Sequence, residues 1–214
     1  SKATAEKVAS LIGAKAEDVA VCSTGLIGEL LPLDNVLSGA DKAFETLADT
    51  AEAGADASHA IMTTDTRPKE AAVTFSGDGI GYDGCTFTVG GMAKGSGMIM
   101  PNMATMIAVI TTDAPLAPEV LHNALVHSVN QSFNKVTVDS DTSTNDTCFL
   151  LASGKAAPNA RIAEGSLAYE EFQTALDALT QMLAREMARD GEGATKLVTV
   201  KITGAALSLI HISE

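Results

Sequence analysis

Short apolar runs of strand length lie along the chain both in adjacent pairs and between helical stretches. Residues 71–75 and 86–89 enclose a loop rich in Gly and Asp, and they predict two neighbouring strands. Residues 167–189 carry apolar side chains at helical spacing and stop before Gly191, which predicts the longest helix. Because the strands come in pairs as well as alternating with helices, the pattern favours α+β layers over a doubly wound parallel sheet.

The remaining elements follow from the same two periodicities. Helices are predicted at residues 4–13, 34–54 and 118–129. Strands are predicted at residues 19–22, 105–111, 135–138, 148–152 and 197–202. Residues 207–214 carry no cap, turn or amphipathic pattern, and we expect them to be a non-native tail.

The charge balance narrows the range of partners. The chain has 27 acidic residues against 14 Lys and Arg, which gives a net charge of -13. A protein that grips nucleic acid or an anionic membrane needs a basic face, so both partners are disfavoured. No apolar run approaches the ~20 residues that cross a bilayer, and no signal-peptide pattern opens the chain.

Cysteine and histidine spacing disfavours a metal site and a disulfide framework. Cys22, Cys85 and Cys148 lie far apart and form no C-x-x-C pair. The four histidines form no H-x-x-x-H or H-E-x-x-H pattern, so a metal enzyme is not expected. Free thiols are typical of a reducing compartment, and we expect a cytoplasmic protein.

One acidic motif suggests a phosphohydrolase. Asp139, Asp141 and Ser143 follow an apolar stretch, much as the D-x-D-x-T nucleophile loop of phosphohydrolases follows a strand. Asp139 would then attack phosphorus while the second carboxylate holds Mg²⁺. The fifth position is Ser here, and an Asx-rich turn that bonds its own backbone is the structural alternative.

A second motif suggests a threonine nucleophile. Within residues 94–114 a Gly-rich loop and Pro101 are followed by Ala104 and Thr105 at the start of an apolar strand. A hydroxyl in this position can attack the preceding carbonyl by an N-to-O acyl shift and release a chain that begins with Thr105. An α-amino group ordinarily has a pKa of about 8, so the new one can take the proton of its own hydroxyl. The alternative is that Thr105 is there for its strand propensity.

Five segments in chain order carry a family resemblance. They are residues 22–28 (CSTGLIG), 62–66 (MTTDT), 94–114 (KGSGMIMPNMATMIAVITTDA), 138–147 (VDSDTSTNDT) and 190–196 (DGEGATK). Together they resemble motifs of the ornithine acetyltransferase family, the bifunctional glutamate N-acetyltransferases of arginine biosynthesis. Ser140 stands where that family usually has Gly. The resemblance runs to about residue 204 and implies one partial domain, residues 1–206, of a longer enzyme.

The resemblance implies a set of site residues. They are the nucleophile Thr105, the self-cleaved bond Ala104–Thr105, the oxyanion-hole residues Thr24 and Gly25, and the substrate contacts Thr63, Lys94, Thr105 and Glu192. A lysine such as Lys94 suits the α-carboxylate of an N-acetylated amino acid, and a carboxylate such as Glu192 suits the ornithine ammonium.

The resemblance also implies a fold and a reaction. The fold is a layered α/β/β/α sandwich like that of N-terminal-nucleophile-like aminopeptidases, incomplete in this chain. The reaction is ping-pong transfer of acetyl from N²-acetylornithine to glutamate, through an acetyl group on Thr105. No metal or organic cofactor is expected, although some family members accept acetyl-CoA as donor. The cleaved chains are expected to stay associated in a hetero-oligomer.

Two other functions stay open from the sequence. One is the Asp139 phosphohydrolase described above. The other is an amide hydrolase or aminopeptidase that uses the same threonine chemistry with water as the acceptor. Because the resemblance covers only part of the family's length, we expect the 214 residues alone to be weakly active or inactive.

Overall fold

The structure is a computed structural model that describes residues 1–100 and 106–203. The chain divides into two compact units, Ser1–Ala60 and Ile61–Glu214. We call them the N-terminal unit and the sheet unit. Residues 104 and 105, at the predicted cleavage bond, and the predicted tail at 207–214 lie outside the described residues.

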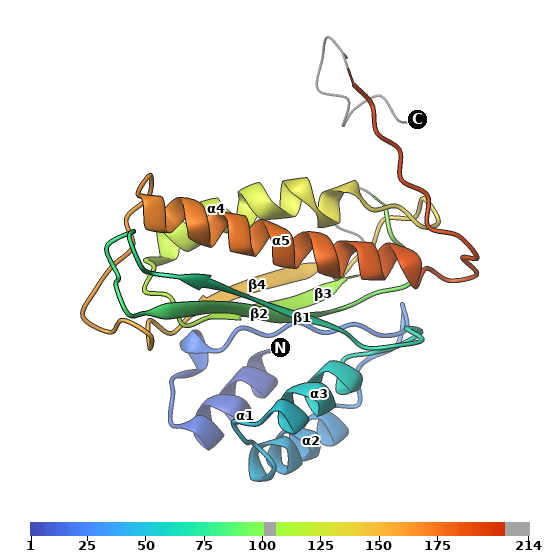
Figure 1. Cartoon of the computed structure of the whole chain (residues 1–214). Helices are drawn as coiled ribbons and strands as arrows, with labels where there is room; N and C mark the ends of the chain where they lie inside the picture. The colour runs from blue at the N-terminus through green and yellow to red at the C-terminus, as the bar shows by residue number, and fades with distance from the viewer. Residues whose placement is uncertain (101–105, 204–214) are drawn as a thin grey trace. The chain divides into compact units, whose positions relative to one another are not determined.

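The N-terminal unit is helical (Figure 1, blue to cyan). Its helices are α1 (Lys2–Ile12), the short 3₁₀ helix η1 (Ala16–Asp18), α2 (Leu33–Glu45) and α3 (Ala51–Ala60). Helix α1 confirms the prediction at residues 4–13 and ends at Gly13, whose φ of 73° is the left-handed conformation that glycine adopts most easily.

The prediction of a single helix at 34–54 is wrong, because the chain breaks between α2 and α3. The Thr46 hydroxyl donates back to the carbonyl of Lys42, which ends α2. The Thr50 hydroxyl accepts the N–H of Ala53, which caps the start of α3. The predicted strand at 19–22 is also absent, since the described N-terminal unit contains no other strand with which it could pair.

A four-stranded mixed sheet forms the centre of the sheet unit. Its strands are β1 (Lys69–Ser76), β2 (Thr86–Lys94), β3 (Ile107–Thr112) and β4 (Thr147–Ala152), in the order β1-β2-β3-β4. Strands β1 to β3 pair antiparallel, and β3 pairs with β4 in parallel. The strands predicted at 71–75, 86–89 and 148–152 are thus confirmed, and the mixture of paired strands with helices confirms the α+β class.

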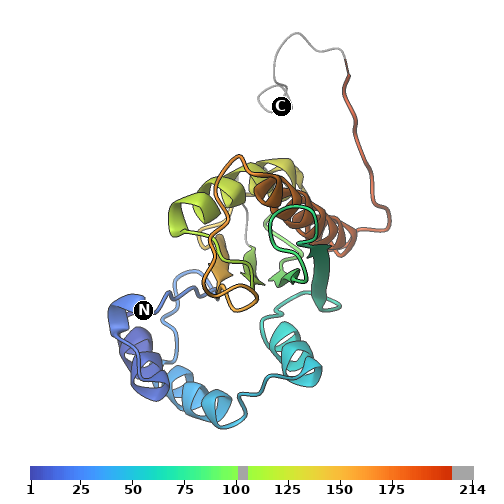
Figure 2. The same cartoon turned by 60° about the vertical axis from the view of Figure 1, so that its left-hand side comes forward.

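Two helices, α4 (Pro118–Gln131) and α5 (Leu167–Arg189), cover one face of the sheet (Figures 1 and 2). Both agree with the prediction. The Ser166 hydroxyl accepts the N–H of Tyr169 and so caps the start of α5. Apolar side chains of α5 and of the inner sheet face are buried together, and each such side chain contributes about 1.5–3 kcal/mol. They include Phe87, Val89, Ile110, Phe172, Leu176 and Leu179.

The opposite face of the sheet carries the alternate residues of each strand. The register pairs Met92 with Val109 and Val109 with Phe149 on this face. Leu151 of β4 is 56% exposed. The described residues of the sheet unit therefore contain one helix layer and one sheet of the four layers that the resemblance implies.

Besides the one at 19–22, two further predicted strands are not formed. Lys135 belongs to the 3₁₀ helix η2 (Phe133–Lys135) and residues 136–138 follow it, where Val138 donates its N–H to the Ile99 carbonyl at 2.8 Å. Residues 197–202 have no regular structure, and the side chains of Val198 and Val200 are exposed. An apolar alternation forms a strand only where a partner strand accepts its hydrogen bonds. None of the helices in the described ranges is long and apolar enough to cross a membrane.

Candidate functional site

The candidate site lies at the end of strand β2, where Lys94 is followed by Gly95, Ser96 and Gly97. Gly95 has a φ of 146°, a conformation that side chains rarely allow, and this lets the chain leave the strand sharply. Lys94 is only 3% exposed. A buried ammonium needs a partner, and the partners of Lys94 come from distant segments of the chain.

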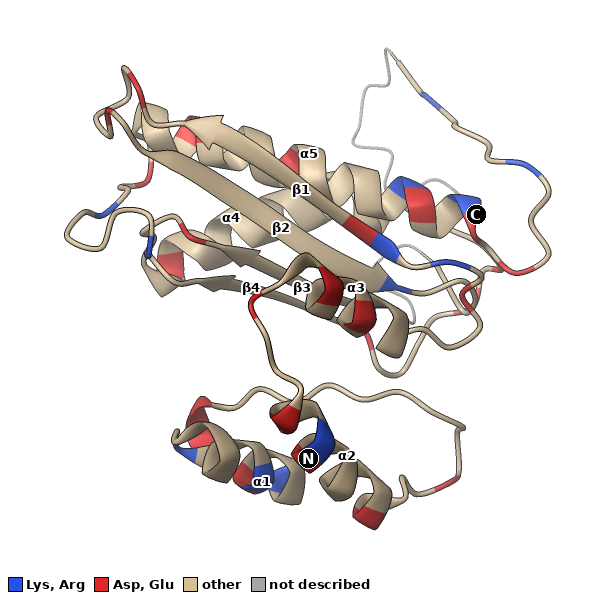
Figure 3. Cartoon of the chain, turned by 60° about the horizontal axis from the view of Figure 1, so that its bottom comes forward, with Lys and Arg blue, Asp and Glu red and all other residues tan. Residues whose placement is uncertain are grey.

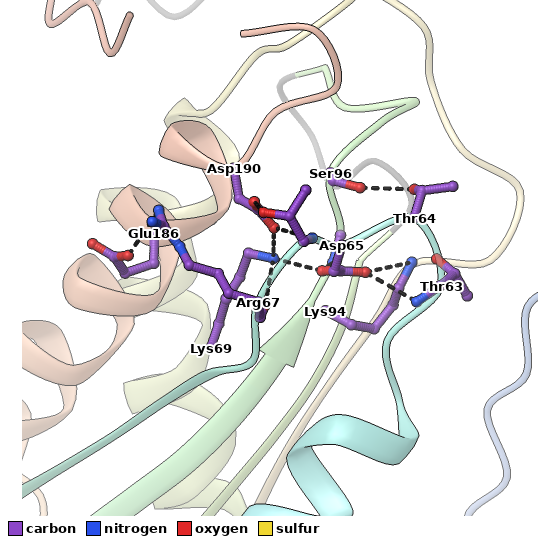
Figure 4. A network of polar contacts seen from close by, with 11 residues as sticks. Thr63, Thr64, Asp65, Arg67, Lys69, Lys94, Ser96, Glu186 and Asp190 are labelled. Atoms are coloured by element: carbon purple, nitrogen blue, oxygen red, sulfur yellow. Dashed lines mark hydrogen bonds and ion pairs between the residues drawn. The ribbon is translucent and has the colours of Figure 1, made fainter. Parts of the chain in front are cut away.

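Asp65 is the centre of the polar contacts around Lys94 (Figure 4). One carboxylate oxygen, Oδ1, accepts the N–H of Gly95 at 2.7 Å. The other, Oδ2, accepts the N–H of Thr63 at 3.1 Å and lies 3.9 Å from the Lys94 ammonium. This carboxylate therefore contacts both Thr63 and the end of β2.

Lys69 joins Asp65 to the end of α5. Its ammonium donates to Asp65 Oδ1 and to Asp190 Oδ2, both at 2.6 Å. The side chains of Lys69 and Asp65 are 0% exposed and that of Asp190 is 4% exposed. Figure 3 shows acidic and basic segments together where β1 begins and α5 ends.

The pKa of each carboxylate reflects two opposing effects. Burial alone raises the pKa of Asp65, but the Gly95 N–H, the Lys69 ammonium and the Thr63 N–H outweigh it and hold this pKa below its usual range. Burial is likewise outweighed at Asp190, where Lys69 and the hydroxyl and N–H of Thr66 lower the pKa. Both groups are therefore carboxylates at neutral pH.

The loop after α5 brings Glu192 to the same place. The N–H of Glu192 donates to the Ser96 carbonyl at 2.6 Å, and the Ser96 hydroxyl contacts the Thr64 hydroxyl at 2.7 Å. A side chain at Gly97 would place its Cβ 2.6 Å from the Glu192 carboxylate. Glycine at this position therefore leaves the room that the Glu192 side chain occupies.

Lys94 is held in a setting that favours loss of its proton. Burial lowers its pKa, and the nearby Lys69 ammonium lowers it further. The carboxylates of Asp65, Glu192 and Asp146 oppose this effect, and Asp65 is the strongest of the three. The charge of Lys94 therefore depends on the acidic groups around it.

A second group of contacts holds the two chain segments that flank residues 101–105. On one side, Asp139 accepts the N–H of Ile99 at 2.9 Å as well as that of Met98. On the other, Asp146 Oδ1 accepts the N–H of Met106 at 2.8 Å. The two ends of the 139–146 loop therefore hold both described flanks of the predicted cleavage segment.

The contacts of Asp139 bear on the phosphohydrolase alternative. Its Oδ1 also accepts the N–H of Asp141 at 3.2 Å, which is an Asx turn. The Asp139 carboxylate thus accepts three backbone N–H groups. This favours a structural role for Asp139, as part of a turn, over a role as a nucleophile. Within residues 1–100 and 106–203, no group of three or more His, Cys, Asp and Glu side chains could hold a metal ion.

The structure thus brings together three of the residues that the sequence singles out, Thr63, Lys94 and Glu192. Thr24 and Gly25 lie in the N-terminal unit, in a segment without regular structure. Thr105 and Ala104 are not among the described residues.

Sequence reasoning gave no role to Asp65, Lys69 and Asp190. Asp65 and Asp190 stood inside two of the five motifs, which was the available signal. Lys69 gave none, because a lone lysine before an apolar strand is usually solvent exposed.

Comparison with known proteins gives a consistent result. Residues 1–208 match the ArgJ family. The arginine biosynthesis bifunctional protein ArgJ of Bifidobacterium longum is 52% identical over 207 residues, which is 96% of this chain and 49% of that protein. The protein of the same name from Symbiobacterium thermophilum is 51% identical over 202 residues, 94% of this chain and 48% of that protein.

The chain spans about half the length of the curated relatives it matches. A crystal structure of the arginine biosynthesis bifunctional protein ArgJ from Bacillus halodurans aligns with 41% of this chain and 41% of that one, at 43% sequence identity and a TM-score of 0.39.

Proposed function

Because the chain belongs to the ArgJ family, we propose that it supplies the nucleophile and part of the substrate site of an ornithine acetyltransferase. In the first half-reaction the Thr105 oxygen attacks the acetyl carbonyl of N²-acetylornithine, and its α-amino group takes the hydroxyl proton. The C–N bond breaks, that proton goes to the leaving amine, and ornithine departs. Glutamate then attacks the acetyl ester and leaves as N-acetylglutamate, which restores the free hydroxyl.

The nucleophile must first be released by cleavage between Ala104 and Thr105. Intramolecular attack by the Thr105 hydroxyl gives an ester, and water then frees a chain that begins with Thr105. The contacts of Asp139 and Asp146 to both flanks of this segment support the proposal, because an acyl shift needs the hydroxyl held against the preceding carbonyl.

The observation that carries the proposal is the meeting of Thr63, Lys94 and Glu192 around the end of β2. A zwitterionic acyl amino acid presents a carboxylate and, in ornithine, a side-chain ammonium. In this arrangement Lys94 pairs with the carboxylate and Glu192 pairs with the ammonium. The Thr63 hydroxyl can hydrogen-bond to the polar atoms of the substrate that lie between its carboxylate and its ammonium.

The oxyanion that forms on the acetyl carbonyl needs donors of its own. Thr24 and Gly25 have this role in our proposal, and loss of one such donor costs about 3 kcal/mol of barrier. The reaction needs no metal or organic cofactor. We further propose that the enzyme works in the cytoplasm and that its cleaved chains stay associated.

The test is an acetyl-transfer assay on the full-length protein that contains this chain. Ornithine release from N²-acetylornithine should depend on glutamate, and EDTA should leave it unchanged. Thr105→Ala should abolish both cleavage and transfer, whereas Thr105→Ser should retain some cleavage. Ornithine release without an acceptor would instead indicate an amide hydrolase, and a Mg²⁺-dependent phosphatase that tolerates Thr105→Ala would indicate the Asp139 alternative.

Two further variants test the substrate residues. Lys94→Ala and Glu192→Ala should raise the KM for N²-acetylornithine while leaving self-cleavage largely intact, because cleavage is intramolecular. Kinetic constants equal to those of the wild type would remove both residues from the site.

A further inference from the structure

Asp65 contacts two of the three described residues of the sheet unit to which we give a substrate role, Thr63 and Lys94. It binds the Thr63 N–H and the Lys94 ammonium with Oδ2, and the Gly95 N–H with Oδ1. Through Lys69 it connects to Asp190, two residues before Glu192. It is itself completely buried, so it does not compete with the site residues for a substrate that arrives from solvent.

We propose that Asp65 is a positioning residue that holds the Lys94 ammonium in place and keeps it charged for binding the substrate carboxylate. This inference rests on the proposed function, since it explains what keeps Lys94 of that same site charged and in place. Lys69 is part of the arrangement, because its ammonium orients the Asp65 carboxylate through a hydrogen bond of 2.6 Å and offsets the negative charge of the buried cluster.

The surroundings of Lys94 leave Asp65 as the main source of its charge. Four charged groups act on the ammonium, namely Asp65, Glu192, Asp146 and the like-charged Lys69. Among the described residues, only Asp65 forms an ion pair with Lys94, at 3.9 Å. Glu192 is exposed and is assigned to the substrate ammonium, and Asp146 is engaged by the Met106 N–H. Asp65 is therefore the carboxylate that is both buried and free of a substrate role.

A pH profile separates this role from a purely structural one. Substrate binding needs protonated Lys94, so kcat/KM falls as the pH rises through the pKa of that ammonium. Removing the Asp65 charge disfavours the ammonium and should lower this pKa further, because an opposite charge at this distance favours the protonated form. A loss of folded enzyme, by contrast, lowers kcat/KM without moving the basic limb.

The experiment measures kcat/KM for N²-acetylornithine against pH in the full-length enzyme. In Asp65→Asn the basic limb should move to lower pH, with KM raised more than kcat is lowered. Asp190→Asn removes an equal charge from the same buried cluster but not from contact with Lys94, so its limb should move less. Glu70→Gln removes an exposed carboxylate next to Lys69 in sequence, and its profile should match the wild type.

The outcomes decide between the possibilities. The inference is overturned if the basic limb of the kcat/KM profile does not move in Asp65→Asn, or if it moves equally far in Asp190→Asn. If Asp65→Asn does not fold, Asp65→Glu serves instead, because it keeps the charge and displaces it by one methylene. The inference is supported if the basic limb of the Asp65→Glu profile lies at the same pH as in the wild type while KM is raised. An unchanged KM in that variant overturns it. A wild-type enzyme without acetyl transfer would refute the proposed function itself, which is a separate result.

Discussion

Replacing Lys69 with Met should destabilise the sheet unit severely. The substitution keeps the unbranched shape and most of the length of the side chain but leaves Asp65 and Asp190 as buried carboxylates without their shared cation. Two charge-assisted hydrogen bonds of 2.6 Å are lost, at about 1.5–3 kcal/mol each. Removal of one partner from a buried ion pair costs about 3–5 kcal/mol, which agrees with that sum. We therefore expect the free energy of unfolding to fall by about 3–5 kcal/mol at pH 7.

Urea unfolding followed by tyrosine fluorescence measures this effect as a free energy. The chain has two tyrosines and no tryptophan, and Tyr82 and Tyr169 both lie in the sheet unit. Lys155→Met is the matched control, because Lys155 is exposed in the same unit and its replacement should change the free energy of unfolding by less than about 0.5 kcal/mol.

The pH dependence gives a second criterion. Asp65 and Asp190 have pKa values lowered by folding, so their contribution to stability is complete above the unfolded pKa of about 3.9 and is lost as the pH falls below it. The difference between wild type and Lys69→Met should therefore be largest near neutral pH and shrink in acid. A difference below about 1 kcal/mol at pH 7, or one that grows in acid, would refute this account of the buried cluster.

Three other perturbations have definite expected results. Ser140→Gly should stabilise the chain by about 1 kcal/mol in the same urea assay, because Ser140 has a φ of 66°, a strained conformation for a residue with a side chain; unchanged or lower stability would count against the strain. Cys148 should resist iodoacetamide at pH 8 until urea is added, because burial raises the pKa of its thiol to about 12; peptide mass spectrometry reads the modification, and fast labelling of the native protein would contradict it. Asp146→Asn should slow self-cleavage about tenfold on a denaturing gel, because a charge-assisted bond to the Met106 N–H is weakened; cleavage at the wild-type rate would show that this flank does not need the carboxylate.

Much of the fold could be predicted because many of its elements have a local sequence pattern. The α5 pattern gave the bounds Leu167–Arg189, and the paired runs gave β1 and β2. Errors arose where the outcome depended on another segment. The runs at 19–22 and 197–202 have strand character, but a strand forms only when a neighbour accepts its hydrogen bonds, and the described chain offers none there.

The same distinction applies to the candidate site. The five motifs gave the family correctly, and they indicated Thr63, Lys94 and Glu192, which the fold then brings together. The buried cation at Lys69 could not be found in this way. Its role comes from two carboxylates that are remote in sequence or separated from it by a turn, and only the tertiary fold makes them neighbours.

The assignment of Thr105 came from its local sequence and from the resemblance, and not from the fold. Ser140 illustrates the converse case, since the sequence marked it as a departure from the family's Gly and the structure places it at a positive φ. The special conformation at Ser140 could therefore be predicted from the local sequence alone, without any distant contact.

In the proposed reaction Thr105 carries the acetyl group between donor and acceptor. The most direct measurement incubates the full-length enzyme with N²-acetylornithine in the absence of glutamate, quenches it in acid and determines the mass of the chain that begins with Thr105. If Thr105 is the carrier, that chain should gain the mass of one acetyl group, located on Thr105 by fragmentation, and should lose it after glutamate is added. A chain without the acetyl group, or with an acetyl group on another residue that glutamate discharges, would contradict this role of Thr105.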